Sequence, residues 1–313
     1  MIRVAAVDCG TNSIRLLVAD VDPGAGSLIE LDRRMEIVRL GQGVDRSGRF
    51  APEALQRTFA ACRSYAATIE ALGAQRVRFV ATSASRDVDN RAEFERGVTA
   101  VLGTSPEVIS GGEEAALSFT GATRELLADP GVRRPYLTVD IGGGSTEFVL
   151  GTDRAGAARS VDVGCVRLTE RHLHGDPPTR GEVAAARTDV EKAIDVAAET
   201  VPIGDAGTLV GLAGSVTTVA AIALDLASYQ PERIHHSRIT ARQVRAVADR
   251  LLAMTHEERA ALPVMHPGRV DVIGAGALIL HAVTERLGVA DVLVSEHDIL
   301  DGIAYETAEM AEE

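Results

Sequence analysis

The sequence predicts two α/β domains of related fold with a central cleft between them, and three observations support this. Two stretches 132 residues apart (140 − 8 = 132) look alike: "VAAVDCGTNSIRLLVADV" around Asp8 and "YLTVDIGGGSTEFVLGTD" around Asp140. Each is an apolar run ending in Asp, a polar turn containing glycine, and a second apolar run, which is typical of a β-hairpin. Strand patterns alternate with helix patterns between and after the hairpins. At 313 residues, the chain is long enough for two domains.

The elements follow in order along the chain. Apolar residues at three- and four-residue spacings after Pro52 predict an amphipathic helix over 52–72. Residues 76–84 are typical of a strand that enters a loop, and 113–128 of a helix with two acids in its first turn. The remaining predicted elements are helices at 181–199, 240–253 and 270–287, and a strand, glycine turn and buried helix over 208–224.

These elements suggest where the domains divide. We expect the first domain over 1–120 and the second over 121–297. The last helix, within 298–313, is expected to pack back onto the first domain.

Composition excludes several functions. The net charge is −13, which argues against a nucleic-acid-binding surface. Lys192 is the single lysine among the 32 basic residues, and it lies outside any Walker-type loop or kinase lysine context. No HExxH metalloprotease motif is present. A polyanion would therefore have to be bound by arginine.

The ends and the cysteines indicate the compartment. The start "MIRVAAVDCG" has no basic leader or apolar signal segment, and no stretch is long enough to span a membrane, so we expect a cytoplasmic protein without a membrane partner. Cys9, Cys62 and Cys165 are widely spaced and odd in number, which favours buried free thiols.

The two glycine turns suggest phosphate chemistry. Backbone N–H groups at such turns can point into one concavity, and the missing Cβ atoms let a phosphate come close. Asp140 and Glu147 flank the second turn and have the hard oxygen ligands that Mg²⁺ prefers. A single turn of this kind usually means only an ordinary hairpin, whereas the pair makes a phosphate clamp the better interpretation.

Five segments, in order along the chain, strengthen this interpretation: "DCGTNSIRLLV" (8–18), "ATSASRDVDN" (81–90), "VISGGEEAALSF" (108–119), "DIGGGSTEFV" (140–149) and "VGCVRL" (163–168). With "GLAGSVTT" (211–218), the hairpins resemble the actin-like ATPase (ASKHA) superfamily. The five segments together resemble the exopolyphosphatase / guanosine pentaphosphate phosphohydrolase family, in a short two-domain form. The resemblance implies two actin-like (ribonuclease H-like) domains.

The resemblance also implies residue roles. Glu114 matches the catalytic base and Arg86 a phosphate-contacting arginine. From the residues alone, dipole-compensating surface charge is the better interpretation of Glu113 and Glu114, and the resemblance reverses this preference. Arg86 could also belong to a solvated helix start, but a polyanion pocket in this chain would have to use arginine. Asp140 and Glu147 match acids that hold the metal, Mg²⁺ or another divalent cation, and Asp8 is grouped with them. The matching phosphate loops are Gly10, Thr11, Asn12 and Ser13, and Gly142, Gly143, Gly144 and Ser145.

Three functions follow as hypotheses. The first is an exopolyphosphatase that releases orthophosphate from the ends of inorganic polyphosphate. The second is a guanosine pentaphosphate 5′-phosphohydrolase, which would belong to the stringent response. The third is an actin-like nucleotide-dependent kinase or assembly protein. The family makes a homodimer plausible.

The histidines carry less weight. His235 and His236 are adjacent, so in a helix or strand their side chains would point apart, which is poor geometry for one metal. We expect them to be surface or interface residues, and His297 to be structural.

Overall fold

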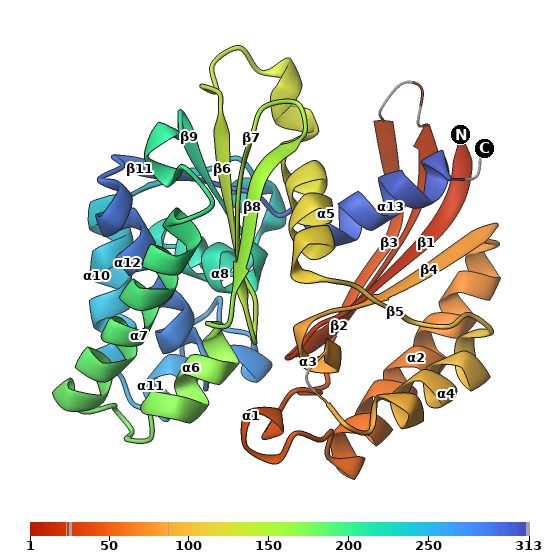
Figure 1. Cartoon of the computed structure of the whole chain (residues 1–313), viewed down its shortest axis with the longest axis horizontal. Helices are drawn as coiled ribbons and strands as arrows, with labels where there is room; N and C mark the ends of the chain where they lie inside the picture. Colours follow the sequence, from red (N-terminus) through yellow and green to blue (C-terminus); the bar gives the residue numbers. More distant parts are fainter. Residues whose placement is uncertain (23, 25–26, 87, 311–313) are drawn as a thin grey trace. The chain divides into compact units, whose positions relative to one another are not determined.

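The computed structural model describes residues 1–22, 24, 27–86 and 88–310. They form two compact units, which are considered separately (Figure 1). Unit 1 comprises Met1–Arg124 and the segment that begins at Ile299, and unit 2 comprises Glu125–Asp298. The chain thus leaves unit 1, builds unit 2 and returns. The expected boundary at residue 120 lies inside helix α5 (Gly111–Thr123).

Unit 1 is built on a five-stranded mixed sheet in the order β3-β2-β1-β4-β5. Strands β1, β2 and β3 form an antiparallel meander, whereas β4 and β5 run parallel to β1. The bounds are β1 (Ile2–Cys9), β2 (Ser13–Asp22), β3 (Ser27–Ile37), β4 (Arg76–Ala81) and β5 (Glu107–Val108).

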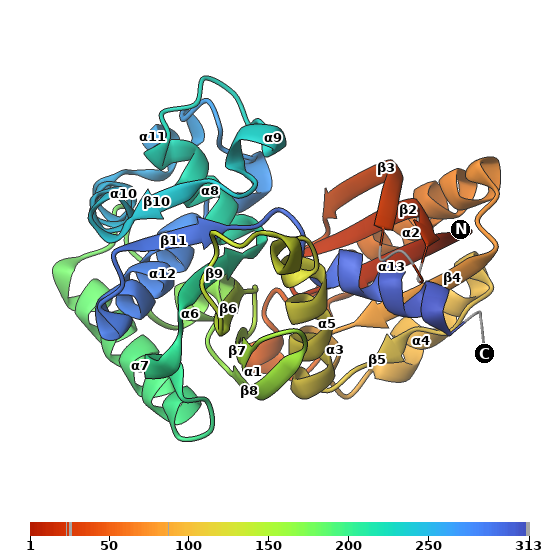
Figure 2. The same cartoon turned by 90° about the horizontal axis from the view of Figure 1, so that it is seen from above.

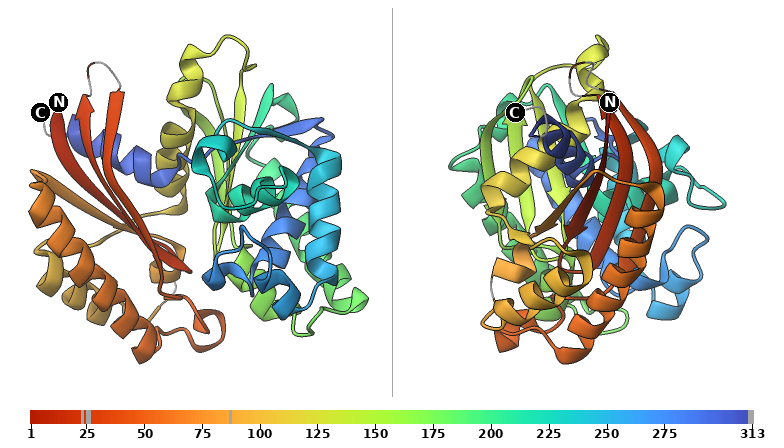
Figure 3. Two further views of the ribbon diagram at one scale, coloured as in Figure 1. Left: turned by 180° about the vertical axis from the view of Figure 1, so that it is seen from behind. Right: turned by 90° about the vertical axis from the view of Figure 1, so that its right-hand side faces the viewer.

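Helices cover both faces of this sheet. Ala5 and Val7 of β1 pack in the same core as α2 (Pro52–Leu72) and α4 (Arg91–Leu102). The alternate residues Val4 and Ala6 pack with α13 (Ile299–Glu309) and with Leu117 of α5. This alternation reflects the two-residue period of a strand. Helices α5 and α13 lie side by side (Figure 2), with the sheet between α13 and the pair α2 and α4 (Figure 3). The short helices are α1 (Val44–Ser47) and α3 (Ser83–Arg86).

Unit 2 repeats this plan. Its six-stranded mixed sheet has the order β10-β11-β9-β6-β7-β8. The strands are β6 (Tyr136–Ile141), β7 (Thr146–Gly151), β8 (Ala155–Val161), β9 (Thr208–Leu212), β10 (Arg238–Thr240) and β11 (Asp291–Val294). The helices are α6 (Cys165–His172), α7 (Arg180–Ala198), α8 (Ala213–Ala223), α9 (Pro231–Ile234), α10 (Ala241–Ala253), α11 (His256–Ala260) and α12 (Ile273–Leu287), with 3₁₀ turns η1 (Glu125–Ala128), η2 (Ile203–Asp205) and η3 (Pro267–Arg269).

The two sheets share one topology. In each, a three-stranded meander is followed by two strands parallel to its first strand: β3-β2-β1-β4-β5 in unit 1 and β8-β7-β6-β9-β11 in unit 2. Strand β10 adds an edge to the second sheet. The α/β class and the inferred duplication are therefore confirmed.

Most predicted elements are confirmed with small changes at their ends. The helix expected over 52–72 is α2, and 208–224 forms β9 and then α8. The helix expected over 113–128 is two elements, α5 and the turn η1. Within the described ranges, no helix combines the length and apolar character needed to cross a membrane.

Candidate active site

The predicted catalytic residues of unit 1 lie at one edge of its sheet. Strands β1, β4 and β5 are parallel and end in register, with Cys9 beside Ala81 and Ala81 beside Val108. The loops that follow these strands therefore leave the sheet at the same edge, where ligand sites of α/β folds are usually found. They carry the first glycine turn, Arg86 and Glu114.

The start of α5 separates the roles of two adjacent glutamates. Ser110 is the N-cap: its side chain accepts a hydrogen bond from the Glu113 N–H, and the Glu113 carboxylate accepts one from the Ser110 N–H. Glu113 is exposed and completes this capping box. Glu114 is buried, 8% exposed, although it lies in the same helical turn. Helix capping thus explains why a glutamate lies at position 113, but it does not explain the buried carboxylate of Glu114.

Glu114 is paired with Arg86. Nη1 of Arg86 donates to Glu114 Oε2 at 2.8 Å and to the carbonyl of Ile109 at 3.1 Å. Burial is the main effect on Glu114 and raises its pKa. The charge of Arg86 and its hydrogen bond lower this pKa, the charge of Asp8 raises it, and Thr82 lowers it. A carboxylate with a raised pKa accepts a proton more readily.

Arg86 has capacity left for a ligand. Its Nε and Nη2 atoms make no hydrogen bond to any residue that the structure describes. Its backbone carbonyl accepts from Arg91 Nη2 at 2.7 Å, which fixes the end of α3. The guanidinium can therefore hold Glu114 through one nitrogen and present the others to an anion.

The first glycine turn joins β1 to β2 tightly. The Gly10 N–H donates to the carbonyl of Ser13 at 2.9 Å, and the Thr11 hydroxyl is 2.9 Å from that of Ser83. Asp8, opposite Arg15 across these strands, accepts from its Nη2 at 2.7 Å and its Nε at 3.0 Å. The arginine charge beside Asp8 makes this carboxylate less suited to a metal cation.

The glycine turn of unit 2 has the same closing bond. The Gly142 N–H donates to the carbonyl of Ser145 at 3.0 Å. The carbonyls of Gly142 and Gly143 point the other way and accept from the first N–H groups of α6, beginning with Cys165 at 2.9 Å. The N–H groups of Gly143 and Gly144 donate to no described residue. The carbonyls of this turn are thus bonded to α6, whereas two of its N–H groups remain as donors for an anion.

Asp140 and Glu147 face each other across β6 and β7. They are a directly opposed pair in the antiparallel register, so their side chains lie on the same face. Both are buried, and Glu147 Oε1 accepts from Ser160 Oγ at 2.7 Å. Opposed carboxylates repel one another, and a hard divalent cation with oxygen ligands would offset that repulsion. The donor set therefore fits Mg²⁺.

Two hydroxyl residues of this region were missed by sequence reasoning. Thr82 lowers the pKa of Glu114, and the Ser83 hydroxyl lies 2.9 Å from that of Thr11. Both lie in the segment "ATSASRDVDN", where the arginine alone was selected. Both residues lie where the strand expected over 76–84 enters its loop, and ligand sites of α/β folds lie where such strands end. This position was the sequence signal that could have identified them.

The expectation that His235 and His236 point apart is wrong. Their rings stack with centroids 3.7 Å apart, because His236 has φ 58° and the pair lies in neither helix nor strand. His235 and His297 also bring their ligand atoms within 4.8 Å of Glu125 and of each other.

This cluster is hydrogen-bonded rather than open to a metal. Nδ1 of His235 accepts the Glu296 N–H at 3.1 Å, so Nε2 carries the ring proton and donates it to Glu125 Oε2 at 3.1 Å. That bond is the main reason why the pKa of Glu125 falls to about 2. With its proton there, Nε2 of His235 has no lone pair for a metal, and the cluster is structural.

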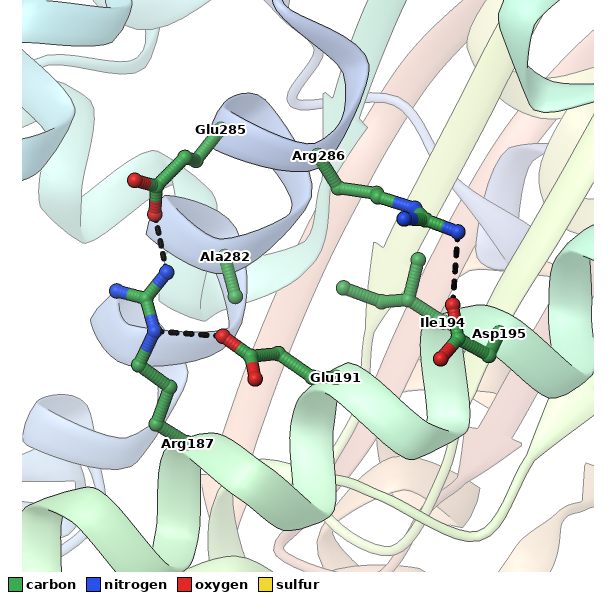
Figure 4. Close-up of a pocket in the computed structure, with 7 residues that line it drawn as sticks. All are labelled: Arg187, Glu191, Ile194, Asp195, Ala282, Glu285 and Arg286. Atoms are coloured by element: carbon green, nitrogen blue, oxygen red, sulfur yellow. Dashed lines mark hydrogen bonds and ion pairs between the residues drawn. The ribbon is translucent and has the colours of Figure 1, made fainter.

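A pocket of about 250 Å³ opens between α7 and α12 in unit 2 (Figure 4). Arg187 bonds both Glu191 and Glu285, and Arg286 bonds Asp195 at 2.7 Å. The charged side chains that line this pocket thus pair with one another, and none of the predicted site residues is among them. We do not place the active site there.

Comparison with known proteins adds independent information. A model of the Ppx/GppA phosphatase family matches residues 17–311. The chain is 51% identical over 317 residues to exopolyphosphatase 2 of Mycobacterium tuberculosis (strain CDC 1551 / Oshkosh), with 98% of each chain covered. The crystal structure of an exopolyphosphatase-like protein is 42% identical with a TM-score of 0.95, covering 99% of this chain and 100% of that one. The Aquifex aeolicus member of the Ppx/GppA family is 28% identical with a TM-score of 0.81, covering 100% and 99%.

Proposed function

The chain belongs to the Ppx/GppA phosphatase family, and from this premise we propose that it is an exopolyphosphatase, a phosphoanhydride hydrolase that releases orthophosphate from inorganic polyphosphate. The observation that carries the proposal is the buried Glu114 held by Arg86 beside the first glycine turn. A base and an arginine with unused donors are what water attack on a terminal phosphate requires.

We assign the steps to residues as follows. Glu114 takes a proton from water as the water oxygen forms a bond to the terminal phosphorus. The bond from that phosphorus to the bridging oxygen breaks, and the shortened chain leaves with the electron pair. Arg86 Nε and Nη2 contact the oxygens of the transferring group, whose charge they stabilise. The loops Gly10, Thr11, Asn12 and Ser13, and Gly142, Gly143, Gly144 and Ser145, supply further donors. The N–H groups of Gly10 and Gly142 close the two turns, so in the second loop the donors are the N–H groups of Gly143 and Gly144.

A divalent cation, Mg²⁺ by preference, belongs to this proposal. Asp140 and Glu147 would hold it, and when bound it would neutralise phosphate charge. Asp8 remains the weaker candidate because Arg15 occupies its Oδ2.

Guanosine pentaphosphate is the alternative substrate, which the resemblance to the exopolyphosphatase / guanosine pentaphosphate phosphohydrolase family implies. The same base and arginine would remove its terminal phosphate, and selectivity between the substrates would come from loop contacts. A homodimer and a cytoplasmic location remain predictions. No contact described above favours the kinase or assembly role.

The test compares wild type with Glu114→Gln and with its neighbour Glu113→Gln as the matched control. Orthophosphate release is measured with Mg²⁺ on short and long polyphosphate, guanosine pentaphosphate and ATP. We expect wild type to prefer polyphosphate and Glu114→Gln to lose about a hundredfold or more in kcat. Glu113→Gln should stay near wild type because glutamine also completes a capping box. Equal activity of wild type and Glu114→Gln would refute the mechanism. A preference of wild type for guanosine pentaphosphate would show that this compound, rather than polyphosphate, is the substrate.

A further inference from the structure

Helix α13 meets the backbone of α5 at Gly302, where the two helices lie side by side (Figure 2). A Cβ at position 302 would lie 2.1 Å from the carbonyl oxygen of Leu117 and 2.7 Å from its carbonyl carbon. These are backbone atoms, which cannot rotate away as the end of a side chain can. Glycine is therefore required for this close approach.

The contact lies one helical turn from the catalytic base. Leu117 follows Glu114 by three residues in α5, about 4.5 Å along the helix axis. The carboxylate of Glu114 meets Arg86 Nη1 at 2.8 Å. Any displacement of α5 at Leu117 changes that distance, because a helix moves as a stiff unit.

Helix α13 is itself held firmly in unit 1. Asp301, the neighbour of Gly302, is buried and accepts from Arg33 Nη2 of β3 at 2.5 Å. Arg78 of β4 pairs with Glu306. The Arg124 guanidinium lies 5.1 Å from the ring centroid of Tyr305. The contacts of Arg33 and Arg78 fix α13 to the sheet, and Arg124, the C-cap of α5, joins α13 to the end of α5. Helix α13 is thus a rigid support for α5.

We infer that Gly302 is a positioning residue for hydrolysis: by letting α13 touch the backbone of α5, it fixes the Glu114 carboxylate against Arg86. The inference rests on the proposed function, which makes Glu114 the base. A methyl group at 302 forces the helices apart by about 1 Å, and a displacement of that size can cost about a hundredfold in rate. A segment that follows the whole of unit 2 in the chain thereby sets the geometry of a site in unit 1.

The experiment compares Gly302→Ala with Gly97→Ala in the full chain, with folding verified by circular dichroism. Gly97 is a matched control in unit 1, since a Cβ there would lie 2.1 Å from the Phe59 ring, in the packing of α4 on α2. We expect kcat for polyphosphate hydrolysis to fall about 30- to 100-fold in Gly302→Ala, with KM changed less than about threefold, and Gly97→Ala to stay near wild type.

A second readout separates positioning from general loss of structure. Burial raises the pKa of Glu114, Arg86 lowers it, and the charge of Asp8 raises it further. If Gly302→Ala moves Glu114 away from Arg86, its pKa rises, and the acidic limb of the kcat–pH profile moves to higher pH. Direct titration of Glu114 by ¹³C NMR should show the same direction in the absence of substrate.

Several results would overturn the inference. They are a kcat of Gly302→Ala within about threefold of wild type, an equal loss in Gly97→Ala, or a fall in kcat with no movement of the acidic limb. If Gly302→Ala does not fold, Arg33→Lys replaces it, because this substitution loosens the contact between β3 and α13. We then expect kcat to fall about 3- to 10-fold and the acidic limb of the kcat–pH profile to move to higher pH. An Arg33→Lys variant with an unchanged kcat and an unchanged acidic limb would refute the inference. An inactive wild type refutes the proposed function and the inference with it, whereas an active wild type with an unaffected variant refutes the inference alone.

Discussion

At the scale of residues, Glu113 and Glu114 are adjacent, yet their environments shift their pKa values in opposite directions. Hydrogen bonds from the N–H and side chain of Ser110 lower the pKa of Glu113. Burial raises the pKa of Glu114. The fold therefore favours the charged form of the first and the protonated form of the second, so their contributions to stability depend on pH with opposite signs.

This difference predicts opposite effects of two substitutions on thermal unfolding. Glu114→Gln imitates the protonated acid, so it should melt above wild type at pH 8, and the gain should vanish as pH falls below the raised pKa. Glu113→Ala should melt below wild type at pH 8, because it loses a cap contact of about 1 kcal/mol, and its deficit should shrink as pH falls through the lowered pKa. Melting curves measured from pH 8 down through the acid range provide the measurement. A Glu114→Gln variant that melts as far below wild type as Glu113→Ala would contradict the burial argument.

The sequence could not distinguish these two glutamates without the family resemblance. Both lie in the first turn of α5, where the helix dipole favours any acid. Only the tertiary contact with Arg86, 28 positions earlier, separates them. The prediction for His235 and His236 was wrong for a related reason. His236 has a positive φ, which has no reliable sequence signal at a non-glycine residue, and this backbone conformation lets the two rings stack.

At the scale of elements, local chemistry decided how well helices and strands could be predicted. Helix α2 begins at Pro52 and ends before Gly73, which has φ 68°, and both ends carry residues that mark them. Helix α5 has no such glycine; Arg124 stays in the helical region and the chain continues into η1. Its end was therefore predicted five residues late (128 against 123).

The β6–β7 hairpin gives a prediction about metal. Asp140→Asn removes one of two facing carboxylates, so in EDTA it should be more stable than wild type by about 0.5 kcal/mol. Millimolar Mg²⁺ should raise the melting temperature of wild type but not of the variant, because a ligand that binds only the folded state stabilises it. Asp8→Asn serves as the control of opposite sign, since it weakens the bond to Arg15 and should melt lower in EDTA. Equal responses to Mg²⁺ in wild type and Asp140→Asn would remove Asp140 from the metal site.

At the scale of the whole molecule, unit 1 depends on a segment at the far end of the chain. Six of the fourteen buried residues in one of its core clusters belong to α13, which covers one face of the sheet with α5. The sequence analysis expected this last helix to pack back onto the first domain. Its apolar residues are interrupted by Asp301, Glu306 and Glu309, and nothing in this local pattern shows which sheet the helix covers.

This dependence predicts unequal effects of truncation. A chain that ends at Asp298 loses α13 and exposes Val4, Ala6 and Leu17 of the sheet, so unit 1 should unfold at markedly lower urea concentration and bind a hydrophobic dye. Unit 2 keeps its own core and should retain its transition. Hydrogen exchange with mass spectrometry assigns each transition to its residues, with 125–298 expected to stay protected. Protection of β1 and β2 equal to that in the full chain would show that unit 1 folds without α13, and it would also remove the support on which the role of Gly302 depends.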